Sequence, residues 1–207
     1  MLINEALRLG DAPRLALVGA GGKTTALFRL GRELLARAPH PDTYTVIATA
    51  TTHLGIEQAR WADHHYIVRQ PVDVDAYAAE LPAGIVLFTG SESGEERLEG
   101  VSSGVLERIR VLADAHNIPL LIEADGSRMK PVKAPAEHEP VIPPFVDTVV
   151  VLAGLSALGK PLATVWVHRA EIFAGLAGLP QGSPITPEAL TRVLNHPQGG
   201  LKSIPDG

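Results

Sequence analysis

Residues 14–25 read Arg-Leu-Ala-Leu-Val-Gly-Ala-Gly-Gly-Lys-Thr-Thr, and this stretch decides the predicted fold. Its first part, 14–18, is an apolar run that is too short for a helix and suits a strand buried on both faces. From residue 23 to residue 38, leucines recur at helical spacing, and Pro39 follows. The sequence therefore predicts a buried strand, a glycine-rich turn and an amphipathic helix in direct succession.

Short aliphatic or β-branched runs alternate with helical patterns along much of the remaining chain. We predict further strands at 44–48, 66–68, 84–88, 119–122 and 146–152, and helices near 56–62, 73–81 and 102–116. Alternation of this kind implies a mostly parallel sheet with helices on both faces. We therefore predict an α/β class with the three-layer, mostly parallel sheet of P-loop NTPases.

Two segments interrupt this alternation. Residues 124–144 contain many prolines, which are unsuited to a central strand or a helix interior, so we expect an ordered surface loop. From about 165 to 207 we expect a small helical appendage, because Thr186 is a good N-cap and Pro187 suits the first helical position. The whole chain, 1–207, is predicted to form a single nucleotide-binding domain.

Composition excludes several classes of protein. The chain has 207 residues, no cysteine and a formal net charge of −5. Disulfides, thiolate metal sites and thiol nucleophiles are therefore excluded, and a reducing cytoplasm is the expected location. We find no basic stripe, signal peptide or long apolar segment, so we expect neither nucleic acid nor a membrane as a partner.

The glycine-rich turn has the composition of a phosphate-binding loop. Its backbone N–H groups and the helix dipole would converge on an anion. Lys23 would contact β- and γ-oxygens of a nucleoside triphosphate, and the Thr24 hydroxyl would bind Mg²⁺. The predicted nucleotide-binding residues are Gly19, Ala20, Gly21, Gly22, Lys23, Thr24 and Thr25. We favour ATP as the nucleotide, with GTP as the alternative.

The composition of this turn allows two other interpretations. It could be a tight connection with Lys23 in solvent, although a lysine is electrostatically misplaced at a helix N-terminus without an anion. It could also begin a dinucleotide-binding motif. That motif requires a third glycine where Thr24 stands and an acid at the end of the second strand, where Thr49 stands.

A pair of carboxylates follows the apolar run at 119–122. Glu123 and Asp125 are two residues apart, so in a strand they would share one face. We assign Asp125 to the metal and Glu123 to orienting water or substrate. Thr51 or Thr52, after another strand, would complete the Mg²⁺ shell or cap a helix. No histidine pattern predicts a transition-metal site.

Basic residues come next in the chain. These residues, Arg128, Lys130 and Lys133, would clamp an anionic substrate or stabilise a phosphoryl-transfer transition state. We assign catalysis to Lys23, Glu123, Asp125 and Arg128. The alternative is a solvated loop. His138 and Glu139 could form an acid–base pair, although an ordinary surface histidine is the stronger interpretation.

The combined motifs resemble the YqeC family of accessory proteins for selenium-dependent molybdenum hydroxylases. The most specific part is Glu123-Ala-Asp-Gly-Ser-Arg128, and the similarity extends along nearly the whole chain. The other matching segments are Val18-Gly-Ala-Gly-Gly-Lys-Thr-Thr25, the threonines at 49–52, Pro131-Val-Lys-Ala-Pro-Ala-Glu-His-Glu-Pro-Val-Ile-Pro143, His168-Arg-Ala-Glu, Ile185-Thr-Pro-Glu and His196-Pro-Gln-Gly-Gly-Leu-Lys202.

The resemblance implies a P-loop nucleotide-binding protein that assists maturation of those hydroxylases. It implies that residues 19–25 hold phosphate and that the two acids lie on the metal side. Two functions remain open. An enzyme would hydrolyse or transfer the γ-phosphoryl group, with a selenium or molybdopterin precursor as its second substrate. A nucleotide-dependent switch or chaperone would deliver a cofactor to a client hydroxylase.

Overall fold

The computed structural model describes residues 2–79, 81–94 and 96–205. The chain divides into two compact units. Unit 1 comprises the described residues of 1–16, 24–123 and 145–148, and unit 2 comprises those of 17–23, 124–144 and 149–207. Within the described ranges, none of the helices has the length and apolar character needed to cross a bilayer. The prediction of a single domain over 1–207 stays a prediction.

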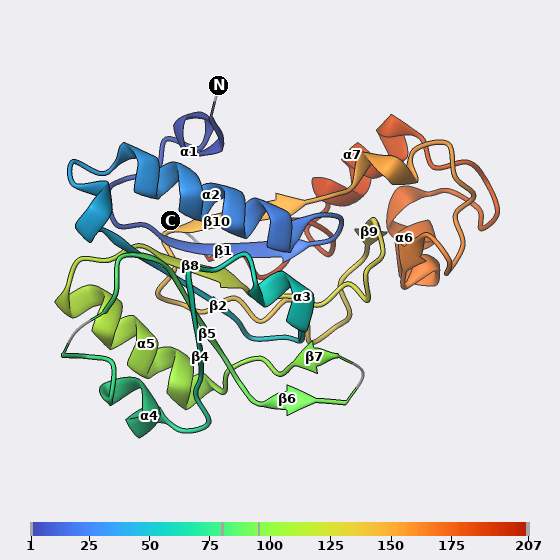
Figure 1. Cartoon of the computed structure of the whole chain (residues 1–207). Coiled ribbons are helices and arrows are strands. Elements are labelled where there is room, and N and C mark those ends of the chain that lie inside the picture. The colour runs from blue at the N-terminus through green and yellow to red at the C-terminus, as the bar shows by residue number, and fades with distance from the viewer. Residues whose placement is uncertain (1, 80, 95, 206–207) are drawn as a thin grey trace. The chain divides into compact units, whose positions relative to one another are not determined.

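A six-stranded, mostly parallel sheet confirms the predicted α/β class (Figure 1). Its strand order is β10-β1-β8-β2-β5-β4. Strand β2 pairs in parallel with both β5 and β8, and β5 pairs in parallel with β4. The strands are β1 (Arg14–Gly19), β2 (Thr45–Ala50), β4 (His64–Ile67), β5 (Gly84–Thr89), β8 (Leu120–Glu123) and β10 (Thr148–Leu152). Continuous burial along β2, β5 and β8 explains why their sequences do not alternate between apolar and polar residues.

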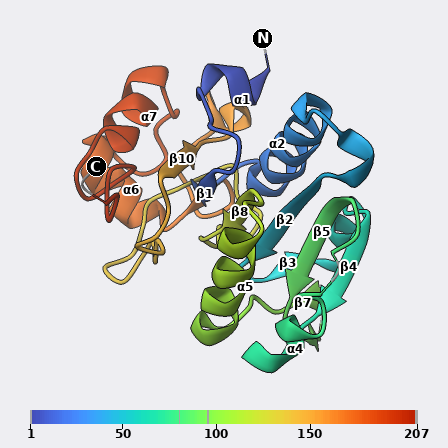
Figure 2. The same cartoon turned by 90° about the vertical axis from the view of Figure 1, so that its left-hand side faces the viewer.

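Helices of unit 1 lie on both faces of its strands, as Figures 1 and 2 show for α2 and α5. Helix α2 packs closely through Gly31, where an added Cβ would lie 2.8 Å from the side chain of Ile85 on β5. Helix α5 starts at a Ser102 N-cap, whose hydroxyl accepts from the Val105 amide at 3.4 Å. The helices are α1 (Ile3–Ala6), α2 (Lys23–Arg37), α3 (Ile56–Ala59), α4 (Pro71–Asp75) and α5 (Ser103–Ala115).

Short elements complete unit 1. A small antiparallel sheet has the order β3-β7-β6, formed by Leu54–Gly55, Arg97–Leu98 and Glu92–Ser93, and a 3-10 turn spans Pro41–Thr43. Helix α3 is shorter than predicted, because the bonds after Ala59 continue as i to i+3 turns. Helix α4 also ends early, at Asp75, and Glu80 of the predicted helix lies outside the described residues.

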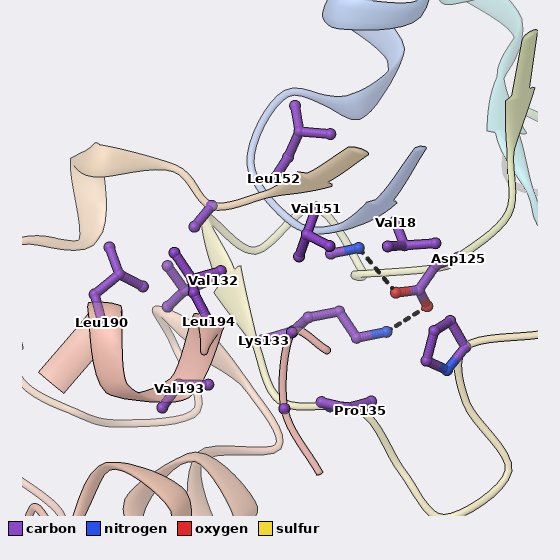
Figure 3. A pocket seen from close by; sticks show the side chains of 15 residues that line it. Val18, Asp125, Val132, Lys133, Pro135, Val151, Leu152, Leu190, Val193 and Leu194 are labelled. Carbon is purple, nitrogen blue, oxygen red and sulfur yellow. Dashed lines mark hydrogen bonds and ion pairs between the residues drawn. The ribbon is translucent and has the colours of Figure 1, made fainter. Parts of the chain in front are cut away.

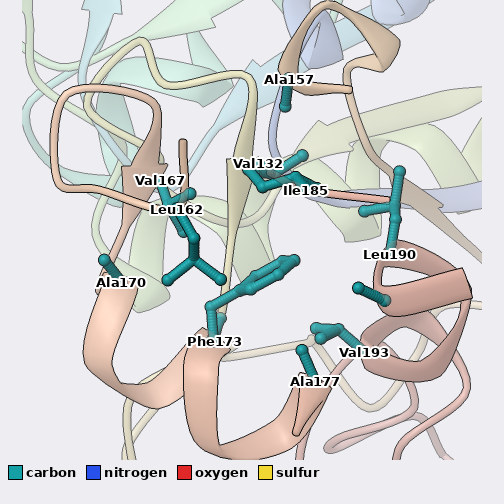
Figure 4. Close-up of a cluster of buried hydrophobic side chains, with 12 residues drawn as sticks. Val132, Ala157, Leu162, Val167, Ala170, Phe173, Ala177, Ile185, Leu190 and Val193 are labelled. Atoms are coloured by element: carbon teal, nitrogen blue, oxygen red, sulfur yellow. The ribbon is translucent and has the colours of Figure 1, made fainter. Parts of the chain in front are cut away.

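Unit 2 has its own apolar core (Figure 4). Phe173 is fully buried at its centre, among side chains from the two C-terminal helices and from the loops before them. The elements are β9 (Val132–Lys133), the 3-10 turn η2 (Leu155–Ala157), β11 (Val167–His168), α6 (Ala170–Ala177) and α7 (Pro187–Leu194). The Thr186 hydroxyl accepts from the Ala189 amide at 3.2 Å, which confirms the predicted N-cap of α7.

The proline-rich segment 124–144 is largely the ordered loop that its composition predicted, but part of it is buried and forms a short strand. Val132 and Lys133 form β9, which pairs in parallel with β11. Val132 and Ala134 are buried in the core of unit 2. Prolines at both sides of β9 rule out a long strand, but they leave a two-residue ladder possible. The C-terminal helices are therefore packed on this segment within one core.

Candidate functional site

The glycine-rich turn of unit 2 adopts a backbone that only glycine accepts easily. Gly19, Gly21 and Gly22 have φ values of +89°, +74° and +108°. A Cβ on Gly19 would lie 2.3 Å from the Leu152 carbonyl oxygen, and one on Gly21 would lie 2.4 Å from the Pro131 carbonyl oxygen. Backbone shape and close packing thus both require glycine at the first and third positions of the loop.

The amides of this turn have two kinds of surroundings. The Gly19 N–H donates to Asp125 Oδ2 at 3.0 Å, and the Ala20 N–H donates to a β10 carbonyl at 2.9 Å. For the N–H groups of Gly21 and Gly22, no acceptor is found among the described residues. The first two amides therefore fix the loop to the protein, and the next two are available to an anion.

Lys23 is buried at the end of this turn, with 4% of its surface exposed. Its ammonium donates to the Gly19 carbonyl at 3.1 Å and lies 3.4 Å from the Ser127 hydroxyl oxygen. The side chain therefore folds back over the loop instead of extending into solvent. This excludes the interpretation of a solvated lysine at a plain helix start.

In unit 1, the hydroxyl of Thr24 donates to Glu123 Oε2 at 2.7 Å, and both side chains are buried. Glu123 is the last residue of β8, and its carbonyl accepts from the Thr51 amide at 3.0 Å. The hydroxyl of Thr52 is buried and has no hydrogen-bond partner among the described residues. Thr24 and Glu123 thus present a hydroxyl and a carboxylate together, whereas Thr51 contributes its backbone here.

Asp125 does not share a strand face with Glu123, because β8 ends at Glu123 and Asp125 follows it. Its two oxygens are both engaged within unit 2. Oδ2 accepts from Gly19, and Oδ1 is ion-paired with Lys133. The prediction that the two acids share one face of a strand is therefore wrong, because the strand is too short to hold both.

Three basic residues were expected to face an anionic substrate, but the structure separates them. The ammonium of Lys133 is buried and donates to Asp125, to the Gly126 carbonyl at 2.7 Å and to Glu139 Oε2 at 2.8 Å. Lys130 donates to a backbone carbonyl at 3.0 Å. Arg128 is exposed and donates to no acceptor among the described residues. Arg128 thus remains the candidate for contact with a substrate.

Glu139 is not suited to the acid–base role weighed for it with His138. Burial alone would raise the pKa of Glu139, but hydrogen bonds from Arg169 and Lys133 outweigh burial and lower the pKa to about 2. Arg169 donates two hydrogen bonds, at 2.7 and 2.6 Å. His138 is 79% exposed and lies 3.9 Å from Glu139. Glu139 is therefore a permanent anion at neutral pH.

Sequence reasoning missed two residues of this cluster, His168 and Arg169. Arg169 precedes α6 with a left-handed backbone, φ 64°. Burial lowers the pKa of His168, and the nearby charges of Arg169 and Lys133 lower it further. The motif His168-Arg-Ala-Glu was the available signal, although nothing in its spacing shows that Arg169 meets Glu139.

A small cavity of about 30 Å³ borders the ion pair of Asp125 and Lys133 (Figure 3). Its remaining walls are mostly apolar, with side chains of β10 and α7 among them. That volume suits one or two water molecules and not a substrate. In the described part of the chain, no three His, Asp or Glu side chains gather in a way that would hold a metal ion by themselves.

Comparison with known proteins agrees with the motifs. A family model described as YqeC protein matches residues 15–171. The Uncharacterized protein YqeC of Escherichia coli (strain K12) is 32% identical over 193 residues, which cover 93% of this chain and 72% of that protein. No solved structure matches the chain. On the family match and this identity, the chain belongs to the YqeC family.

Proposed function

We propose that the protein binds a nucleoside triphosphate with Mg²⁺ at residues 19–25 and hydrolyses or transfers its γ-phosphoryl group. The observation that carries the proposal is the buried Lys23, whose ammonium lies over the loop at 3.1 Å from the Gly19 carbonyl. A lysine ammonium held over a glycine-rich turn between a strand and a helix is the arrangement by which P-loop proteins contact the β- and γ-phosphates of a nucleotide.

The loop geometry supports the same proposal. The amides of Gly21 and Gly22 find no acceptor among the described residues, and amides in this position bind phosphate oxygens well. Lys23 would contact the β- and γ-phosphates, and Thr25, in the first turn of α2, would add its hydroxyl or amide. ATP is the expected nucleotide and GTP the alternative.

Thr24 and Glu123 fit the metal better than the set expected from the sequence, which was Thr24, Asp125 and Thr51. Mg²⁺ prefers oxygen ligands and keeps several waters, so it needs only one or two protein groups beside nucleotide phosphates. Thr24 and Glu123 offer a hydroxyl and a carboxylate that already touch at 2.7 Å. We therefore assign Mg²⁺ to these two residues. Bound there, Mg²⁺ would neutralise charge on the transferred phosphoryl group.

The contacts and exposure of each side chain suggest its role in catalysis. Lys23 would stabilise the charge that develops on the phosphoryl oxygens. Arg128 is exposed and donates no hydrogen bond to the described residues. It would supply a second cation to the substrate that receives the phosphoryl group or to the transition state. Asp125 accepts from Gly19 and is ion-paired with Lys133. We therefore propose that Asp125 holds the loop in shape and does not bind Mg²⁺.

Family membership extends the proposal to a biological role: maturation of selenium-dependent molybdenum hydroxylases, with a selenium or molybdopterin precursor as second substrate. The alternative is a slow nucleotide-dependent switch acting on a client hydroxylase, in which Asp125 would hold the loop through Gly19 and Lys133. The switch would still need Lys23 and Mg²⁺.

A thermal-shift screen tests nucleotide binding. A ligand that binds only the folded protein raises its Tm, and we expect millimolar ATP or GTP with Mg²⁺ to do so. Lys23→Met should remove the increase. Lys160→Met is the matched control, since Lys160 is exposed and its ammonium lies 5.0 Å from the Trp166 ring centroid. No increase in the parent protein, or an undiminished increase in Lys23→Met, would refute the proposal.

Phosphate release then separates the two functions. Release stimulated by a candidate small-molecule substrate supports the enzyme. Release stimulated only by a purified molybdenum hydroxylase supports the switch. Both measurements use the full chain with Mg²⁺, and Lys23→Met serves as the inactive reference in each.

A further inference from the structure

We infer that Lys133, Glu139 and Arg169 are positioning residues, which hold Asp125 on the Gly19 amide and thereby fix the phosphate-binding loop. The inference rests on the proposed function for its meaning, but the chain of contacts lies wholly within unit 2. We call the four charged side chains, Asp125, Lys133, Glu139 and Arg169, the charge chain.

The loop end of the charge chain is a hydrogen bond to a charged acceptor. Asp125 Oδ2 accepts the Gly19 N–H at 3.0 Å, and Oδ1 is ion-paired with Lys133 (Figure 3). Only 3% of the Asp125 side chain is exposed. Bonds to ionised groups are stronger and more directional than neutral ones. Asp125 therefore fixes the peptide at Gly19, where φ is +89°.

All three ammonium protons of Lys133 are used in hydrogen bonds. Its acceptors are Asp125, the Gly126 carbonyl at 2.7 Å and Glu139 at 2.8 Å, one for each ammonium proton. The side chain is 3% exposed, so loss of a partner would leave a buried ammonium poorly compensated. If Glu139 lost its charge, one carboxylate would remain to compensate the ammonium, and the position of Asp125 would change with it.

The far end of the charge chain is a two-pronged pair. Arg169 Nη1 and Nη2 donate to the two oxygens of Glu139 at 2.7 and 2.6 Å, a geometry that sets the orientation of both groups. The paired strands help, because His168 of β11 is in register with Lys133 of β9. Arg169 follows directly with a left-handed backbone, φ 64°, which a non-glycine residue adopts only where its surroundings impose it.

Stability alone does not explain the charge chain. Buried ion pairs are often no more stabilising than apolar side chains of similar volume, whereas removal of one partner is costly. Unit 2 already has an apolar core around Phe173. The charge chain ends at the Gly19 amide and orients it through a directional hydrogen bond. Apolar side chains in the same place would not orient an N–H group.

The first experiment needs no nucleotide. The Gly19 amide resonance and its hydrogen-exchange rate are measured by NMR in the parent protein and in Glu139→Gln. We expect a shifted resonance and faster exchange, because the acceptor at Gly19 moves. Glu33→Gln is the matched control: Glu33 is a buried carboxylate that accepts from Arg29 at 2.7 Å and from the Asn4 amide at 3.0 Å in unit 1. An unchanged Gly19 amide in Glu139→Gln overturns the inference.

The second experiment measures the Kd of Mg²⁺-ATP by calorimetry well below the Tm of each variant, so that a loss of stability by itself leaves the Kd unchanged. We expect Glu139→Gln to raise the Kd about tenfold, as loss of a supporting partner commonly does. Arg169→Lys keeps the charge but loses one prong and should show a smaller increase than Arg169→Gln. Glu33→Gln should leave the Kd unchanged. An equal Kd in all variants overturns the inference.

The two proposals fail in different ways. If the parent protein binds no nucleotide, the proposed function fails, while the Gly19 amide still tests the charge chain. If the parent binds nucleotide and both the amide and the Kd are insensitive to Glu139→Gln, the inference alone fails. If Glu139→Gln does not fold, Arg169→Lys takes its place in both measurements with the same criteria.

Discussion

The two units keep their charged side chains in different surroundings. In unit 1, the pairs Arg32–Asp63 and Arg108–Asp75 lie at the surface, where both members are at least one-third exposed. In unit 2, Lys133 and Asp125 are buried together. Exposed pairs contribute little and are screened by salt, whereas buried pairs need geometry that leaves no group unsatisfied. The difference indicates that the buried Lys133–Asp125 pair fixes the position of its groups, which these two surface pairs of unit 1 do not.

The largest expected effect tests whether the apolar core of unit 2, and not its charges, supplies stability. Phe173→Ala removes a fully buried ring and should lower the free energy of unfolding by about 3–5 kcal/mol. Denaturant titration measures it. Met129→Ala, at a side chain that is 90% exposed, is the control and should change stability by less than about 0.5 kcal/mol. A small loss in Phe173→Ala would contradict the comparison.

Acid should weaken unit 2 through Glu139. Its pKa is about 2 in the folded protein against an ordinary value of 4.5. The stabilisation is therefore complete above pH 4.5 and is lost as the pH falls towards 2, by up to about 3 kcal/mol. The difference in Tm between the parent and Glu139→Gln should stay constant from pH 7 to about pH 4.5 and shrink as the pH falls further to 3. A constant difference would show that the carboxylate charge is not responsible.

The two neighbouring acids offer a sharper comparison between the units. Glu123→Gln removes the carboxylate that meets Thr24 in unit 1, and should raise the Mg²⁺ concentration needed for nucleotide binding about tenfold. Asp125→Asn should weaken nucleotide binding while leaving the Mg²⁺ requirement nearly the same, because Asp125 acts on the loop. Nucleotide titrations at graded Mg²⁺ distinguish them. The opposite result would return the metal to Asp125.

The smallest effect is expected at the surface of unit 1. Arg108→Gln breaks the exposed pair with Asp75 and should cost less than about 1 kcal/mol, and still less in high salt. Thermal unfolding at low and high ionic strength checks this. A loss as large as that of Phe173→Ala would show that the surface pairs of unit 1 carry more of its stability than their exposure implies.

Local signals made much of the fold predictable. The run at 14–18 and the periodicity from residue 23 gave β1 and α2 almost to the residue, because a strand buried on both faces and an amphipathic helix leave strong patterns. The Thr186 cap was predictable because threonine followed by proline is a local signal for a helix start. The short strand β9 was not predictable, because two strand residues between prolines leave no periodic signal.

The candidate site divides along the same line. The shape of the glycine-rich loop was predictable, since glycines with positive φ beside a lysine are a local feature. The separation of Glu123 from Asp125 was not, because it depends on β8 ending at Glu123. The burial of Lys133 was not predictable either. Its partner Glu139 is bound by Arg169, which lies 30 residues farther along the chain.

The α/β class, the glycine-rich loop before α2 and the family could all be recognised from the order of residues, since each depends on neighbouring residues or on motifs. Folding was needed to show which carboxylate meets Thr24, which meets Gly19, and that Arg128 stays exposed. Burial and ion pairing join groups that are distant in the chain. No pattern of spacing records which of several charges will find a partner when water is excluded.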